Sequence, residues 1–355
     1  MNLSPLPSNI SRTGGCTLTG ALAVTTGIRD SVTIIHGPAG CAHHNFSLLH
    51  ATLLDQDQVE IPKVLSSALS EQDIIFGGEG ALLDSIKEAA SMSPGIICVL
   101  STCVTEMIGD DVRAVAGNTG LPVCVVPTAG FLGGTFEDGF SEALIALSDY
   151  EVSSSTAGTP PFPVPGAVNL IGEKNLESEL DQNFREVKRL IGLLDLEVNI
   201  RFAHNIHSSE ICHLSEGSLN LLREPALVRV GEHLRDAFGT PFIPSFPIGI
   251  SGTLAFIRES ASVSAMDSEP ALERETETQR AMVEQFSGLS GARVKFSAIP
   301  GTRELHFARE IGQILGLVES LDGIPLSVPY PLPVGTSGIR HMLHRWRREL
   351  ACPVA

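Results

Sequence analysis

The sequence predicts an α/β protein whose domains are Rossmann-like, doubly wound parallel sheets, and two observations support this fold class. Short apolar runs alternate with amphipathic stretches of helical periodicity through the first 150 residues, as they do in sheets covered by helices. Glycines stand at two junctions between such stretches, within residues 37–40 and 77–80, where the chain has to turn sharply into a helix.

The expected strands of the first domain are short continuous apolar runs, which is the pattern of strands buried on both faces. They are residues 31–35, 74–76, 96–100 and 122–126. Amphipathic stretches such as residues 81–90 and 107–117 are expected to form helices between them.

The rest of the chain repeats this pattern after a break. Residues 153–166 are rich in serine and proline without periodicity, so they are predicted to link two domains. Strands are expected at 167–171 and 197–202, a helix at 180–194, and a basic helix at 339–350. The expected division is an N-terminal α/β domain, a second α/β domain and a reduced third α/β region, at residues 1–152, 167–260 and 261–355.

The composition argues against several classes of protein. The formal net charge is −17, from 24 basic and 41 acidic residues, whereas proteins that bind nucleic acid generally have a basic footprint. The sequence has no apolar run of the length that spans a membrane, and its N-terminus lacks the basic and apolar regions of a secretory signal. We therefore expect a cytoplasmic protein with neither nucleic acid nor membrane as a partner.

Two common nucleotide-binding motifs are absent. The sequence contains no GxxxxGK[ST] loop, and the turn at Gly77, Gly78 and Gly80 does not complete GxGxxG, because Leu83 stands where the last glycine belongs. The ends of the predicted strands are therefore expected to hold something other than an ordinary nucleotide site.

Seven cysteines without an export signal are not expected to form a disulfide framework. Cys98 and Cys124 lie inside apolar strands, and Cys212 and Cys352 stand in no recognisable motif. These four cysteines are interpreted as small packing residues.

The other three cysteines stand in loops at the ends of predicted elements. Cys16 follows Gly14-Gly15, Cys41 closes His36-Gly-Pro-Ala-Gly-Cys41, and Cys103 lies in Ser-Thr-Cys103-Val-Thr-Glu106. Thiolates at such places suit soft metals and iron–sulfur clusters, and helix N-termini favour the thiolate form. Their spacing alone leaves ligation and plain packing equally open, because no CxxC pair occurs.

The local motifs resemble the nitrogenase component 1 family. The segments that carry this resemblance are Gly-Gly-Cys16, His36-Gly-Pro-Ala-Gly-Cys41, Ser101-Thr-Cys-Val-Thr-Glu106 with Ile108-Gly-Asp-Asp111, and Thr128-Ala-Gly-Phe-Leu-Gly133. The family includes molybdenum-iron protein subunits, their cofactor scaffolds and the dark-operative protochlorophyllide reductase. The resemblance implies that Cys16, Cys41 and Cys103 ligate an iron–sulfur cluster of the [4Fe–4S] type near the interface of a homodimer.

Departures from the family narrow the expected activity. The chain is short, His43-His44 follow the Cys41 motif in place of the usual residues, and the C-terminal ligands of the iron–molybdenum cofactor have no clear counterpart. Dinitrogen reduction is therefore not expected. The short form resembles the catalytic subunits of Ni-sirohydrochlorin a,c-diamide reductive cyclases.

This narrower resemblance implies a place in coenzyme F(430) biosynthesis for methanogenesis. A nickel tetrapyrrole would be reduced by six electrons and closed to a γ-lactam. Its nickel belongs to the substrate, and a separate iron protein, CfbC, would hydrolyse MgATP and deliver the electrons. Two alternatives stay open: another nitrogenase-like reductase of a tetrapyrrole or thioether, and a non-catalytic scaffold for metallocofactor maturation.

The predicted C-terminal helix concentrates positive charge in an acidic chain. Arg340, His344, Arg347 and Arg348 share a helix face, which suits the carboxylates of a tetrapyrrole. The alternative is that these cations complement the helix dipole. The turn at residues 335–338 offers backbone donors that would help to bind an anion.

The histidines near Cys41 are the weakest candidates for chemistry. His43 and His44 are possible proton donors, because histidine titrates near neutral pH. A solvent-facing or packed role is the alternative, and His36 is expected to be a structural residue of the turn before Cys41.

Overall fold

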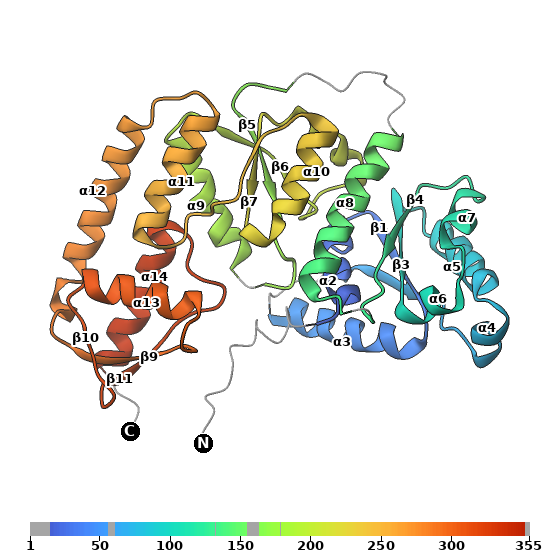
Figure 1. The fold of residues 1–355 in the computed structure, drawn as a ribbon, viewed down its shortest axis with the longest axis horizontal. Coiled ribbons are helices and arrows are strands. Elements are labelled where there is room, and N and C mark those ends of the chain that lie inside the picture. Colours follow the sequence, from blue (N-terminus) through green and yellow to red (C-terminus); the bar gives the residue numbers. More distant parts are fainter. Residues whose placement is uncertain (1–14, 56–60, 132, 155–162, 178, 352–355) are drawn as a thin grey trace. The chain divides into compact units, whose positions relative to one another are not determined.

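Three parallel-stranded sheets with flanking helices make up the chain (Figure 1). This computed structural model describes residues 15–55, 61–131, 133–154, 163–177 and 179–351. Of these, residues 15–177 and 198–244 belong to one compact unit, and residues 179–197 and 245–351 to another. The predicted α/β class is confirmed, whereas the domain boundaries 1–152, 167–260 and 261–355 stay a prediction.

The first sheet has the strand order β2-β1-β3-β4. Its strands are β1 (Ser31–His36), β2 (Lys63–Ser66), β3 (Ile96–Ser101) and β4 (Val123–Pro127), and each neighbouring pair is parallel. Every residue of β1 and β3 is buried, as their continuous apolar runs predict. The ends of β1 and β3 are aligned, because His36 is in register with Ser101.

The helices of this part correct two sequence predictions. Residues 74–76, expected as a strand, end helix α4 (Glu71–Phe76). The helix forms here because Ser70 and Asp73 make a capping box that fixes its first turn. The helix expected at 107–117 is divided into α6 (Cys103–Ile108) and α7 (Val112–Gly117), since Gly109 adopts a left-handed conformation between them.

The second sheet has the order β6-β5-β7-β8, with β5 (Ala167–Ile171), β6 (Glu197–Phe202), β7 (Leu219–Leu222) and β8 (Phe242–Ile243). Helix α10 (Val228–Phe238) contacts β7 and β8. Short 3₁₀ turns, η1 (Ser208–Glu216) and η2 (Pro225–Leu227), complete this part.

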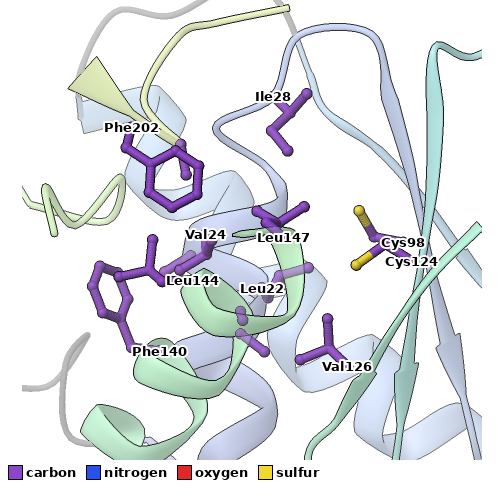
Figure 2. Packing of buried hydrophobic residues seen from close by; sticks show 14 of the residues in the cluster. Leu22, Val24, Ile28, Cys98, Cys124, Val126, Phe140, Leu144, Leu147 and Phe202 are labelled. Atoms are coloured by element: carbon purple, nitrogen blue, oxygen red, sulfur yellow. The ribbon is translucent and has the colours of Figure 1, made fainter. Parts of the chain in front are cut away.

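Helices α2 (Thr17–Thr25) and α8 (Phe136–Ser154) pack against each other in the core of the larger unit. Figure 2 shows Leu22, Phe140 and Leu144 of these helices packed with residues of both sheets. Cys98 and Cys124 are paired in register and buried in this core. Their predicted packing role is confirmed.

The smaller unit contains the third sheet, in the order β10-β9-β11. Its strands are β9 (Arg293–Ser297), β10 (Val318–Glu319) and β11 (Ile324–Ser327). Its helices are α9 (Leu180–Gly192), α11 (Gly249–Val263), α12 (Glu269–Gln285), α13 (Arg303–Ile314) and α14 (Gly335–Ala351), with a short η3 turn (Ser287–Leu289). Trp346 of α14 is fully buried in the core of this unit.

Candidate metal centre

The three motif cysteines stand at the N-terminal ends of three helices. Cys16 is the exposed residue that precedes α2, and Cys103 is the half-buried first residue of α6. Cys41 is the half-buried third residue of α3 (Ala39–Asp55). Unpaired backbone N–H groups and the positive end of the helix dipole lie at such positions, and they favour a thiolate.

Close contact between two loops brings Cys41 and Cys103 together. The His36 carbonyl, at the end of β1, accepts a hydrogen bond from the Thr102 N–H at 3.1 Å. A Cβ on Gly37 would lie 2.1 Å from the Thr102 hydroxyl, so a side chain at position 37 would push the loops apart. The segment leading to Cys41 is therefore held against the residue that precedes Cys103.

A second set of contacts places Cys16 at the same end of the first sheet. The Thr17 hydroxyl donates to the Thr128 carbonyl, and the Thr128 hydroxyl donates to the Ser101 carbonyl at 2.6 Å. Helix α8 also approaches closely, because a Cβ on Gly139 would lie 1.9 Å from the Thr17 carbonyl oxygen. The start of α2 is thus fixed beside the ends of β3 and β4.

The three thiols affect one another electrostatically. Burial raises the pKa of Cys41, and the neighbouring Cys16 and Cys103 raise this pKa further. A bound metal reverses this preference, because a coordinated thiol is deprotonated. Three convergent thiols at helix N-termini therefore fit the donor set of an iron–sulfur cluster.

Within the described ranges, no three His, Cys, Asp or Glu side chains are grouped to hold a single metal ion. The ligands of a polynuclear cluster bind separate iron atoms, so they need not meet at one point. The assignment of Cys16, Cys41 and Cys103 as ligands stays a prediction.

His36 is a structural residue, as the sequence predicts. Its side chain is fully buried, with Nδ1 2.9 Å from the Ser67 hydroxyl and Nε2 3.1 Å from Asp110 Oδ2. Burial lowers the pKa of His36, although Asp110 opposes the shift. Asp110 also accepts from the Gly78 N–H at 2.9 Å. These contacts join the end of β1 to the loops after β2, α4 and α6.

The neighbouring acidic residues have local partners. Glu106 accepts a 2.6 Å hydrogen bond from the Ser101 hydroxyl, and Asp111 caps α7 by accepting from the Ala114 N–H at 2.9 Å. His43 and His44 are exposed on α3. Their suggested proton-donor role stays a prediction.

The remaining cysteines differ from the packing prediction in one case. Cys212 is exposed in η1, where its thiol donates to the Ser209 carbonyl at 3.1 Å, so the prediction was wrong for this residue. The 3₁₀ turn supports the backbone around it with local bonds and leaves this side chain outside the core. Cys352 lies outside the described residues.

The basic C-terminal helix lies in the smaller unit, whereas the three motif cysteines lie in the larger one. Residues 335–338, expected to form a turn before the helix, are its first turn, because α14 begins at Gly335. Glu186 accepts from the Ser337 N–H at 3.1 Å, and Glu275 accepts from the Thr336 hydroxyl. The expectation of an anion site at this turn is therefore wrong, because buried carboxylates of the chain already occupy it.

Sequence reasoning missed a buried ionic group after β5. The Lys174 ammonium lies 2.9 Å from Glu137 Oε1 and 2.6 Å from Glu224 Oε1, and its side chain is only 3% exposed. It also lies 5.5 Å from the centre of the Phe136 ring. The available signal was the charged pair Glu173-Lys174, which directly follows an apolar strand and a glycine.

Comparison with known proteins shows a family match over most of the chain. The family described as nitrogenase component 1 type oxidoreductase matches residues 16–316. The nitrogenase molybdenum-iron protein alpha chain of Methanococcus maripaludis is 25% identical over 91% of this chain and 70% of its own length. The cofactor biosynthesis protein NifE of Nostoc sp. is 30% identical over 74% of this chain and 54% of its own.

Two further similarities are informative. A light-independent protochlorophyllide reductase subunit from Bradyrhizobium sp. is 28% identical over 72% of this chain and 50% of its own length. The solved structure "Nitrogenase Cp1 at pH 5" superposes with a TM-score of 0.64 at 22% identity, covering 90% of this chain and 66% of that one. The chain thus spans between half and 70% of the length of these three curated relatives. No helix within the described ranges has both the length and the apolar character needed to cross a membrane.

Proposed function

Because the chain belongs to the nitrogenase component 1 type oxidoreductase family, we propose that it is the electron-receiving catalytic subunit of a nitrogenase-like reductase. The observation that carries this proposal is the convergence of Cys16, Cys41 and Cys103 at three helix N-termini. These thiolates would hold an iron–sulfur cluster, of the [4Fe–4S] type, near the interface of a homodimer. When bound, such a cluster accepts and passes on electrons.

The residues around the cysteines would hold this cluster in place. Thr17, Thr128 and Thr102 bind backbone groups at the ends of the strands and fix the loops that carry the thiols. The buried His36 supports these loops through its hydrogen bonds with Ser67 and Asp110. A rigid supporting shell is what a precise ligand set requires.

The substrate we propose is Ni-sirohydrochlorin a,c-diamide, as for the CfbD subunit of the reductive cyclase. Six electrons would reduce the ring, and a side-chain amide would close a γ-lactam during coenzyme F(430) biosynthesis. Its similarity to a subunit of a protochlorophyllide reductase supports this choice. The similarity to a protein of Methanococcus maripaludis is consistent with a role in methanogens.

A separate iron protein, CfbC, would hydrolyse MgATP and dock near Cys103. Helix α4 packs against α6, and both present apolar side chains to solvent: Ile75 and Met107 are each 72% exposed and Phe76 is 85% exposed. Exposed apolar groups of this size are typical of surfaces that bind another protein. The absence of a GxxxxGK[ST] loop in this sequence is consistent with an ATPase on another chain.

The proposed cluster is tested by anaerobic purification of single Cys→Ser variants. We expect iron, sulfide and visible absorption to fall at positions 16, 41 and 103. Variants at positions 98, 124 and 212 are the matched controls and should keep the wild-type iron content. A wild-type protein without iron, or normal iron in every variant, would contradict the proposal.

Turnover distinguishes the substrate proposal from its alternatives. The wild-type protein is supplied with Ni-sirohydrochlorin a,c-diamide, reduced iron protein and MgATP, and the ring-reduced lactam is sought by mass spectrometry. A cluster-loaded protein that reduces a different tetrapyrrole or a thioether would favour another reductase. One that reduces nothing would favour a maturation scaffold, a role consistent with its similarity to the cofactor biosynthesis protein NifE.

A further inference from the structure

Helix α14 presents positive charge along one side. We call Arg340, His341, His344, Arg347 and Arg348 the basic strip; these positions fall within one third of the helix circumference at 3.6 residues per turn. The opposite side carries Met342, Leu343 and Trp346, which are buried in the core of the smaller unit. The strip lies on the other side of the helix, where His344 contacts the core residue Phe286 edge-on. His341, Arg347 and Arg348 are exposed, and Arg340 and His344 are half-buried.

Within the described residues, no carboxylate balances the charges of the basic strip. Across the described parts of the chain, no salt bridge joins a carboxylate to a residue of the strip. The nearby Glu349 instead binds the Ser327 N–H and hydroxyl. Arg347 donates to His344 Nδ1 at 3.0 Å and lies 5.4 Å from the centre of the Phe286 ring.

Two features of the strip are unfavourable without an anion. Burial lowers the pKa of His344, and the positive charges of Arg347, His341, Arg340 and Arg348 lower it further. Like charges three and four residues apart destabilise a helix. In addition, Arg340 Nε is buried and, within the described residues, has no hydrogen-bond acceptor, and an unpaired buried donor is destabilising.

We propose that the basic strip binds the peripheral carboxylates of an anionic tetrapyrrole. Arginine guanidinium groups pair with carboxylates through two parallel hydrogen bonds. The strip extends for about 12 Å along the helix at 1.5 Å per residue, so it suits several carboxylates spread around one macrocycle better than a single phosphate. The choice of a tetrapyrrole rests on the proposed function, whereas the polyanion site rests on the strip alone.

The test is a fluorescence titration with uroporphyrin, an octacarboxylate macrocycle, at low ionic strength. We expect the double variant Arg347→Gln/Arg348→Gln to weaken binding at least about tenfold, because charged hydrogen bonds are lost. Arg280→Gln is the matched control, since Arg280 is an exposed arginine of the same unit that pairs with Glu277. It should bind uroporphyrin like the wild type.

Thermal unfolding shows whether the double variant is folded. Helical circular dichroism like that of the wild type, followed by one cooperative transition, would show that a loss of binding does not reflect unfolding. Equal affinity in the double variant and the wild type would overturn the proposal, as would full competition by inorganic phosphate at the same ionic strength. Uroporphyrin binding through the strip in a protein without cyclase turnover would uphold the strip and reject the proposed substrate. Turnover by the double variant with an unchanged KM would reject the strip as the binding site and uphold the proposed substrate.

Discussion

At the residue scale, Cys41 stands where a free thiolate is disfavoured. Burial and the two neighbouring thiols all raise its pKa, so Cys41 is poorly suited to act as an unassisted nucleophile. Coordination to a cationic cluster removes the proton and offsets the repulsion among the sulfurs. The local electrostatics therefore favour a metal-bound role for Cys41 over a role as a reactive cysteine.

His36 gives the protein an acid-sensitive component of stability. Burial lowers the pKa of His36 in the folded state, so the unfolded chain takes up a proton on this side chain more readily. The free energy of unfolding contributed by His36 is thus fully present above the ordinary pKa of about 6.5 and decreases as the pH falls below it. We therefore expect the contribution of this group to decrease between pH 7.5 and 5.5.

Urea unfolding at these two pH values measures this contribution. His36→Gln should show a smaller difference between the two pH values than the wild type, even if it is less stable at both. His43→Gln, an exposed position on α3, is the matched control and should keep the wild-type difference. An unchanged difference in His36→Gln would show that the buried histidine is not the source.

Lys174 is a second residue whose replacement has a specific expected effect. Its buried ammonium contacts carboxylates of Glu137 and Glu224. Lys174→Met should lower the free energy of unfolding by about 3 kcal/mol, because it leaves carboxylates without their counter-charge. Adding Glu137→Gln and Glu224→Gln should restore at least half of this loss.

The matched control for Lys174 is Lys87→Met. Lys87 is 64% exposed and pairs with Asp84 on the surface of α5 (Glu79–Ser91), so its loss should cost less than about 1 kcal/mol. Urea unfolding compares the variants. Equal losses at positions 174 and 87 would contradict the importance of burial.

At the scale of elements, the close packing of α2 and α8 determines where Cys16 lies. A Cβ on Gly20 would stand 1.9 Å from the Phe136 carbonyl oxygen, so Gly20→Ala must separate the two helices. We expect destabilisation by about 1–3 kcal/mol from overpacking and a lower iron content after anaerobic purification. Gly117→Ala is the control, because no atom lies within 4 Å of the added Cβ. An iron content at the wild-type level in Gly20→Ala would mean that α2 does not position a ligand.

The elements also show what the sequence could and could not predict. Continuous apolar runs correctly predicted β1, β3, β4 and β5. The strand predicted at residues 74–76 is wrong, because apolar content does not distinguish a buried strand from an exposed helical turn. The capping box of Ser70 and Asp73 favours the helix here. The prediction of an anion-binding turn at residues 335–338 failed for a different reason. Its donors are taken by Glu186 and Glu275, which are more than 60 residues away along the chain.

At the scale of the whole molecule, the same limit applies to the candidate centre. The motifs predict which cysteines matter, whereas their convergence depends on contacts between distant segments, such as Gly37 with Thr102 and Thr17 with Thr128. Spacing along the chain does not reveal these contacts. Lys174 was missed for the same reason, since its carboxylate partners come from α8 and from the residues after β7.

The division into compact units predicts where a lost ligand will be felt. Cys16, Cys41 and Cys103 all belong to the larger unit, whereas β9, β10 and β11 belong to the smaller one. In anaerobic hydrogen exchange, Cys103→Ser should therefore increase exchange in peptides of α2, α3 and α6, because the loops lose their common ligand. Peptides of β9–β11 should exchange as in the wild type, and the exposed Cys212→Ser variant should change neither set. Equal acceleration in both units would show that the cysteines support the fold of the entire chain rather than a local centre.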